Sequence, residues 1–377
     1  MRNSKIILSI LFIAGNAIGA GVLGLPLVLG RAGFMASVVA CLMLYFLALG
    51  AGLMFAKLFC KNHQKDLPTF FFQELGKSGL NIFSISFFSL FFCLLVAYWA
   101  GLISIFGAFG SFVWPLFLSA LIAIFLQTCG TAFLSRAVGA LTIGLIISFL
   151  GLIFSTFFQG GEGLFAAGNW RVANLALPIL FCSYGFQGAI PIVCRQLNFR
   201  WEDIKRAIFY GTLLPLIFNI FVLLISFRAL TVDELLKGAA EGIPVFLLFK
   251  EKFSSSCFVT LGQCFSFFAI GSSLLGVTAT LSGALRDIFH RYEWYEKVEV
   301  VLIIIFPLFI AVYCAHIFIT ALEVAGGICL NLIAGILPSL VAIRRKVPGP
   351  LPWIFLFAFL YVFFIELFNL IHMLSGK

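Results

Sequence analysis

The 377-residue chain is 62% hydrophobic and only 10% charged, with a mean hydropathy of +1.15. About a quarter of the residues in an ordinary soluble domain are charged, so this composition excludes a soluble protein and indicates a polytopic membrane protein. The formal net charge of +9 fits membrane topology and contact with anionic lipid headgroups, and it requires no nucleic acid partner.

Uncharged segments locate the membrane-spanning helices, each of which needs roughly 20 apolar residues. The segment 78–135 is long enough for two spans, divided near the turn-like residues 107–115. With that division the chain predicts eleven spans, within residues 6–30, 32–56, 78–135 (two), 137–158, 172–194, 207–227, 254–285, 300–320, 324–343 and 351–374.

Basic residues predict the orientation, since Lys and Arg accumulate on the cytoplasmic side. With the N-terminus in the cytoplasm, 17 of the 24 Lys and Arg residues fall on the inner side. Eleven spans then place the C-terminus on the outer side. Residues 1–20 also have the pattern of a signal peptide, but the apolar run continues through Val22–Gly30, which a signal peptide would not need.

The first span is interrupted at its middle. Ile13–Pro26 (IAGNAIGAGVLGLP) holds four glycines, one asparagine and a closing proline. Irregular backbone at membrane depth is tolerated only where protein or an aqueous cavity surrounds it. Close helix packing explains one such glycine cluster equally well.

A second interruption favours a functional reason. The sixth span holds Phe181–Val193 (FCSYGFQGAIPIV), again with glycines, polar residues and a proline. Spans one and six are five apart, so two five-span units enter the membrane from opposite sides. Matching interruptions in inverted repeats indicate the midplane site of a secondary transporter. Amides and a helix N-terminus suit a carboxylate, while carbonyls and a helix C-terminus suit an ammonium, so the pattern predicts an amino-acid-like substrate.

Other classes of function lack their motifs. The ten cysteines and four histidines are dispersed, without a C-x-x-C pair, and no G-x-x-x-x-G-K-[ST] loop occurs. We expect no metal, no cofactor and no ATP-hydrolysing subunit. A membrane enzyme needs clustered acidic or His residues near one face, whereas the clusters at 61–66 and 287–297 suit solvated loops. A channel favours pore-lining rings in an oligomer, whereas this chain carries a complete internal repeat.

Several segments resemble one transporter family. Gly15–Pro26 (GNAIGAGVLGLP) resembles the first-span signature of the hydroxy and aromatic amino acid permeases, of the amino acid–polyamine–organocation superfamily, in their tyrosine- and tryptophan-specific branch. Further similar segments follow in the family's order and cover most of the chain: Ala97–Leu102, Ser183–Pro191, Asp203–Leu216, Ser272–Thr278, Phe318–Gly327 and Gly335–Pro338. Two residues depart from the pattern, because many relatives carry His in place of Gln187 and Asn in place of Ala189.

The resemblance implies a leucine-transporter-type fold: two inverted repeats of five helices, 1–158 and 159–346, with spans one and six broken, followed by an eleventh span in 347–377. It implies import of tyrosine, tryptophan or both across the bacterial inner membrane, by proton symport and alternating access, with the C-terminus in the periplasm. A sodium-coupled transporter, or one for another amino acid, stays the alternative.

The resemblance and the two interruptions together give the candidate substrate site. The first-span residues would act mainly through their backbone, and Phe186 would stack on an aromatic substrate, although most of the 48 Phe residues face lipid or core. The candidates are Asn16, Ala17, Gly19, Ala20, Gly21, Tyr98, Ser183, Tyr184, Phe186, Gln187 and Ser272.

The ion-coupling candidates fall into two sets. Glu366 is an acid inside a span and therefore a functional candidate, although its place outside the repeats also fits an interfacial role. Ser272, Ser273 and Thr278 offer oxygens to a sodium ion beside the first-span carbonyls. Glu323 and His316 are expected at the turn between spans nine and ten.

The sequence also predicts the local structure of two segments between spans. Thr231–Gly242 begins with a capping box, Thr231 with Glu234 three residues later, and predicts a short outer helix that is either a lid or a solvated surface helix. His63–Lys77 is basic and apolar and is expected at the inner membrane interface.

Overall fold

Long apolar helices build the part of the chain that the computed structural model describes, namely residues 2–19, 21–61, 66–108, 117, 121, 131–156, 168–252, 257–289, 301–314 and 316–375. Every regular element in these ranges is a helix. Seven of them are long and apolar enough to cross a membrane, or eight if one bent pair counts as a single span, and two shorter apolar helices accompany them. The expectation of an all-α polytopic protein is therefore confirmed.

The first half of the chain begins with the bent pair and ends at the second interruption. Its elements are α1 (Arg2–Ala17), α2 (Gly21–Leu29), η1 (Gly30–Ala32), α3 (Phe34–Lys61), α4 (Leu67–Ala108), α6 (Thr131–Thr156), η3 (Val172–Ala176), α7 (Leu177–Cys182), η4 (Gln187–Ala189) and α8 (Ile190–Gln196).

The second half alternates long helices with short connecting ones. Its elements are α9 (Trp201–Ala229), α10 (Val232–Glu241), η5 (Val245–Leu247), α11 (Phe249–Lys252), α12 (Cys257–Phe289), η6 (Val301–Ile305), α14 (Phe306–Tyr313), α15 (Ile317–Val324), η7 (Ala325–Leu330), η8 (Leu332–Ile336), α16 (Leu337–Arg344) and α17 (Leu351–Leu374). The elements η6, η7 and η8 are π-helical.

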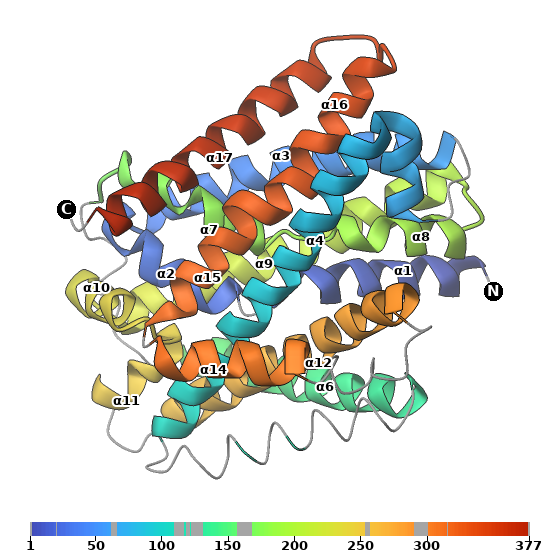
Figure 1. The fold of residues 1–377 in the computed structure, drawn as a ribbon. Helices are drawn as coiled ribbons and strands as arrows, with labels where there is room; N and C mark the ends of the chain where they lie inside the picture. Colours follow the sequence, from blue (N-terminus) through green and yellow to red (C-terminus); the bar gives the residue numbers. More distant parts are fainter. Residues whose placement is uncertain are drawn as a thin grey trace.

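The helices pack so that the second interrupted span and the α2 half of the first lie inside the bundle, whereas most of α1 is exposed. Helix α9 packs against α1, α2 and α3, while α4 packs against α12, α14 and α15. The N-terminus lies at the end of the molecule that holds α8, and the C-terminus lies at the opposite end (Figure 1). Helix α10 is at the same end as the C-terminus.

Most predicted spans fall on these helices, with one boundary wrong. We expected a turn near residues 320–324, but α14 ends at Tyr313 and α15 already begins at Ile317. The connection passes through His316 in a left-handed conformation, with φ 71°. We took the charge of Glu323 as the boundary between spans nine and ten, whereas the structure places Glu323 within the helical segment Ile317–Arg344.

Part of the topology lies beyond what the structure tests. The predicted fourth span falls almost wholly on residues outside the described ranges. The count of eleven spans, the inverted repeat and the division at residues 158 and 346 therefore stay predictions.

The two loop expectations have different outcomes. The capping box is confirmed, because the Glu234 amide donates to the Thr231 hydroxyl while the Thr231 amide donates to the Glu234 carboxylate. The helix ends at Gly242 in the left-handed conformation. In the inner segment, residues 62–65 lie outside the described ranges, and α4 runs from Leu67 to a break at Gly76, where φ is 72°.

Helix α10 lies over α2. The side chain of Leu235 is fully buried, and a Cβ on Gly30 would lie 3.0 Å from the Cβ of Leu235. A Cβ on Gly238 would meet the side chains of Leu27 and Leu248 at 3.0 and 2.6 Å. Eight of the nine residues of α2 are buried, and α10 is one of the elements that pack on it, together with α9, α7 and η3.

Two ion pairs fasten the opposite end. The Arg2 guanidinium donates to both oxygens of Asp203, at 3.0 and 2.7 Å, and thereby joins the start of α1 to the first turn of α9. Arg345, just after α16, donates through Nε to the Glu74 carboxylate at 2.7 Å and through Nη2 to its other oxygen. This second pair ties the end of span ten to the helical segment before Gly76.

The contribution of the Arg345–Glu74 ion pair to stability can be measured. A buried carboxylate that loses a charged hydrogen-bond partner costs more than the roughly 1–3 kcal/mol of a neutral group, and Glu74 is 8% exposed. We expect Arg345→Gln to lower the unfolding temperature of the detergent-solubilised protein, measured by scanning fluorimetry. Arg344→Gln removes the same charge from the exposed neighbouring position and should leave that temperature nearly unchanged. Equal shifts in the two variants would show that the ion pair does not hold this end together.

Candidate substrate site

The first interruption lies between α1 and α2. Helix α1 ends at Ala17, α2 begins at Gly21, and the two axes differ by 51°. Ala20 lies outside the described residues, while Gly19 is part of the non-helical connection. Its carbonyl accepts a bond from the Val22 amide at 3.2 Å. The end of α1 and the start of α2 thus leave helix-terminal carbonyls and amides at the same depth.

The second interruption separates α7 from α8. Helix α7 ends at Cys182, residues 183–186 form consecutive turns, and the short η4 leads into α8 at Ile190. The amides of Ser183 and Tyr184 bond backward to α7 carbonyls. Pro191 is accommodated in the first turn of α8, where its missing N–H costs no helical bond.

The two interruptions touch each other. A Cβ on Gly21 would lie 3.4 Å from the backbone nitrogen of Ser183 and 3.5 Å from its Cα. A Cβ on Gly24, one turn further along α2, would lie 2.6 Å from Cδ1 of Ile179. Glycine at position 24 leaves room for the Ile179 side chain, while at Gly21 the backbone of α2 lies beside that of Ser183 at ordinary van der Waals spacing for a Cβ. The glycine cluster therefore packs two helices closely and also brings the two breaks together.

Residues of the predicted third and eighth spans lie beside the first break. A Cβ on Gly19 would lie 3.2 Å from Oγ of Ser273 in α12 and 3.7 Å from the Tyr98 hydroxyl in α4. Tyr98 is 5% exposed. The structure thus brings together four of the predicted segments: the breaks of spans one and six, Tyr98 and the pair Ser272–Ser273. Of that serine pair, Ser273 faces the first break.

The site contains a residue that we did not predict. Asn219, fully buried in α9, donates from Nδ2 to the Ser183 hydroxyl at 2.9 Å, and that hydroxyl donates to the Leu180 carbonyl at 2.7 Å. The bonds fix Ser183 at the break. An amide inside an otherwise apolar span is the signal that identifies such a residue, because polar side chains in membrane helices find partners within the bundle.

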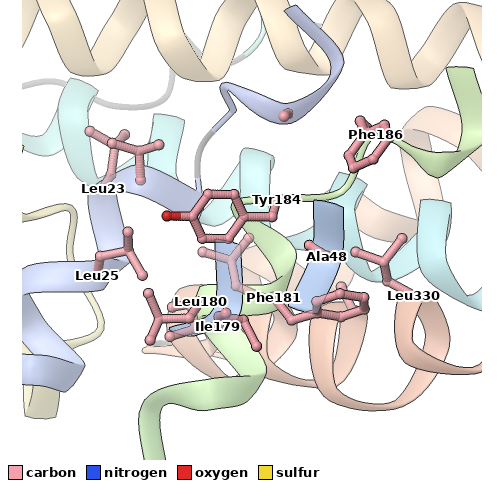
Figure 2. Packing of buried hydrophobic residues seen from close by; sticks show 14 of the residues in the cluster. Leu23, Leu25, Ala48, Ile179, Leu180, Phe181, Tyr184, Phe186 and Leu330 are labelled. Carbon is pink, nitrogen blue, oxygen red and sulfur yellow. The ribbon is translucent and has the colours of Figure 1, made fainter. Parts of the chain in front are cut away.

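Two aromatic rings flank the second break. Tyr184 donates its hydroxyl to the Cys41 carbonyl of α3 at 3.2 Å, and Figure 2 shows that this hydroxyl points toward the α2 side chains Leu23 and Leu25. Phe186 points to the other side, and a Cβ on Gly52 would lie 2.3 Å from its ring. Both rings are packed walls of the site.

Gln187 differs from the other polar residues at the break. It is fully buried, and neither Oε1 nor Nε2 has a hydrogen-bond partner within the described part of the chain. A buried amide without partners is costly, so natural proteins retain one where something else supplies the bonds. Gly188, the next residue, is exposed and has no atom within 4 Å of where its Cβ would be.

Three predicted residues bond their own helices or close them. Asn16 is exposed, and its Nδ2 donates to the Phe12 carbonyl at 2.8 Å. The Ser272 hydroxyl donates to the Ala269 carbonyl at 3.2 Å. Ala17 is the buried last residue of α1. Thr278 is buried in α12, more than a turn beyond Ser273.

Within the described ranges, no group of three or more His, Cys, Asp or Glu residues is placed to hold a metal ion. The site consists of helix termini, hydroxyls, amides and aromatic rings. Such a set binds and orients a small polar molecule, and it offers no nucleophile beside a base.

The family assignment follows from the whole length of the chain. Residues 2–363 match the model of the tryptophan/tyrosine permease family. The chain belongs to this family. It is therefore a multi-pass membrane permease of a bacterial family, and it is not an enzyme.

Individual relatives are similar over nearly their full lengths. The tyrosine-specific transport system 2 of Haemophilus influenzae is 28% identical over 93% of this chain and 90% of its own length. Glutamine transporter 2 of Aliivibrio fischeri is 26% identical over 91% of this chain and 90% of its own. Both relatives are named as transporters of amino acids, with different side chains.

A solved structure shows the same fold. The manganese transporter of Eremococcus coleocola, in complex with an aromatic bis-isothiourea substituted compound, superposes with a TM-score of 0.58 over 99% of this chain and 87% of its own. The sequences are 14% identical, so the likeness concerns the fold alone.

The two buried amides predict opposite effects on stability. Gln187→Leu removes unpartnered polar atoms, so it should raise the unfolding temperature of the substrate-free permease, since apolar replacement of an unpaired amide removes a penalty of about 1–3 kcal/mol. Asn219→Leu breaks the bond to Ser183 and should lower that temperature. Scanning fluorimetry in detergent measures both. A fall with Gln187→Leu as large as that with Asn219→Leu would mean that Gln187 has a structural partner.

Proposed function

We propose that this permease is a secondary active transporter that imports aromatic amino acids, tyrosine or tryptophan or both, by proton symport and alternating access. The observation that carries the proposal is the contact between the two interrupted helices at Gly21 and Ser183. Helix interruptions that meet inside a bundle are where this class of transporter binds its substrate.

The backbone at the interruptions suits the common part of an amino acid. The N-terminus of α2 at Gly21 carries helix-terminal amides and the positive end of a helix dipole, which favour a carboxylate. The C-terminus of α1 at Ala17 carries carbonyls and the negative end, which favour an ammonium. Both ends are within the same short connection, so one zwitterion can contact both.

The side chains around the break suit the variable part. Tyr98, Tyr184 and Phe186 supply rings, which favour an aromatic substrate through offset stacking or edge contacts. The free amide of Gln187 offers one donor and one acceptor to a phenol hydroxyl or an indole N–H. The same amide suits a glutamine side chain, so the glutamine-transporting relative names the alternative substrate.

We prefer proton coupling to sodium coupling because the side-chain hydroxyls that could bind a sodium ion do not converge on one point. Ser272 bonds its own helix, and Thr278 lies more than one turn from Ser273. Only Ser273 of the three hydroxyl residues faces Gly19 within the described ranges. A sodium site built from these residues would rest mainly on first-span carbonyls, and it stays the alternative.

The proposed topology has eleven spans in the bacterial inner membrane, in two inverted repeats, 1–158 and 159–346, and a final span in 347–377. The termini lie at opposite ends of the molecule (Figure 1), which supports an odd number of crossings. The N-terminus is assigned to the cytoplasm from the distribution of Lys and Arg. The end covered by α10 is then periplasmic.

Uptake into proteoliposomes tests the proposal. With tyrosine and tryptophan as labelled substrates, we expect accumulation under an inward pH gradient and none under a sodium gradient. Gly19→Val fills the space beside Tyr98 and Ser273 and should reduce uptake at least about tenfold, the effect of losing well-oriented binding contacts. Glutamine serves as the competing substrate.

The matched control is Gly139→Val in α6, an exposed position with no atom within 4 Å of where a Cβ would be, which should transport like the unaltered protein. Accumulation driven by sodium alone would move coupling to the first-span carbonyls and Ser273. Uptake of glutamine without either aromatic amino acid would overturn the substrate assignment. Equal losses in both valine variants would remove the first break from the site.

A further inference from the structure

Span eleven carries a buried acid. Glu366 of α17 is 1% exposed, and neither of its carboxylate oxygens has a hydrogen-bond partner within the described ranges. Asn369, one turn along the same helix, is near the carboxyl but outside hydrogen-bond geometry. Burying a charged carboxylate without hydrogen-bond partners costs free energy. Acidic residues inside membrane spans are therefore rare and usually functional.

The side chain of Glu366 lies against span ten and the first half of span six. A Cβ on Gly327 of η7 would lie 2.7 Å from both Cβ and Cγ of Glu366, and 2.8 Å from Cβ of Pro178 in α7. A Cβ on the neighbouring Gly326 would lie 2.2 Å from the Pro178 carbonyl oxygen. Three elements thus meet at glycine-dependent contacts around one carboxyl group.

A second acidic residue lies one turn away on the neighbouring span. Glu323 is half-buried in the last turn of α15, four residues before Gly327 and hence on the same side of that span. Gly327 in turn lies against Cβ and Cγ of Glu366, so both acidic residues are placed where α15, η7 and α17 meet. Glu323 and Glu366 are named the carboxyl pair below.

The elements around the carboxyl pair contribute few other titratable groups. The thiols and Tyr98 are buried or half-buried, and the remaining side chains are exposed. These groups are Cys93 and Tyr98 on α4, Cys182 on α7, Cys329 on η7, Arg344 on α16, and Tyr361 and His372 on α17. No ion pair joins a basic side chain to the carboxyl pair in the described part of the chain.

The backbone that bears Gly327 has unusual geometry. The elements η7 and η8 are consecutive π-helical stretches separated by Asn331. The Asn331 amide donates to the Gly327 carbonyl and to the Phe359 carbonyl of α17, both at 3.0 Å. Single π-helical turns occur frequently at functional sites, and here they are tied directly to the helix that carries Glu366.

We propose that the carboxyl pair carries the proton that the permease moves with its substrate. Two neighbouring carboxyl groups without a cation do not both stay charged, so they hold one proton between them. Helix α7 contacts Glu366 at one end and ends beside Ser183 at the other. Movement of α7 during alternating access therefore changes the surroundings of the carboxyl pair, and protonation in turn biases the position of α7.

The inference rests on the proposed function, since it names the residues of proton symport, and Glu366→Gln and Glu323→Gln test it in proteoliposomes. A gradient of one pH unit drives about tenfold accumulation at one proton per substrate. We expect both variants to lose this accumulation, while exchange of labelled for unlabelled tyrosine or tryptophan stays within about twofold of the unaltered protein, because glutamine mimics a protonated carboxyl.

Two further variants keep the test decisive. Asp233→Asn removes an exposed carboxylate from the first turn of α10 and should accumulate substrate like the unaltered protein. Glu366→Asp keeps a titratable group and should retain gradient-driven accumulation at a reduced rate. This conservative variant, together with Glu323→Gln, replaces Glu366→Gln if the latter does not purify as a folded protein.

Gradient-driven accumulation by folded Glu366→Gln or Glu323→Gln at the level of the unaltered protein would overturn the assignment of the carboxyl pair and leave aromatic amino acid transport standing. Accumulation by the unaltered protein under sodium alone would overturn it as well. Failure of the unaltered protein to exchange or accumulate any aromatic amino acid is a different result, because it would refute the proposed function itself.

Discussion

Backbone polar groups at membrane depth must find partners within the protein, and two spans of this permease interrupt their helices there. The contact that makes this possible is the approach of α2 to α7, where Gly21 lies beside the Ser183 backbone and Gly24 beside Ile179. With the breaks in contact, the helix ends at Ala17 and Gly21 share one small volume. Ser273 and Tyr98 lie beside Gly19 at the first break, and Tyr184, Phe186 and Gln187 lie at the second.

That constraint explains which features could be predicted from the sequence and which could not. Glycine, proline and polar residues within apolar runs mark interruptions directly, so both breaks were predictable, as was the α10 capping box. Asn219, an amide in an apolar span, carried a signal that we did not use, but only the structure identifies Ser183 as its partner. The turn between spans nine and ten was misplaced because a charge was taken as a boundary, whereas Glu323 lies inside the bundle. Which of Ser272 and Ser273 faces Gly19 depends on helix rotation, which a two-residue motif does not determine.

Helix α17 is the least buried of the candidate spans, as a peripheral helix would be. One of its faces nevertheless packs on η7, η8 and α7 and buries Glu366 against them. Helix α17 is thus in contact with one of the two interrupted spans. The proposed substrate site and the proposed carboxyl pair lie near the two ends of the six-residue helix α7, a short physical route for the coupling that we propose.

The most direct measurement is a structure of the permease determined with tyrosine or tryptophan bound, by cryo-electron microscopy or crystallography. The account predicts ligand density between the two breaks, with the carboxylate at the Gly21 end of α2, the ammonium at the Ala17 end of α1, and the side chain near Phe186 and Gln187. Density elsewhere in the bundle, with the Gly21–Ser183 contact unchanged and nothing bound at the breaks, would contradict it. The glycine cluster would then serve helix packing alone.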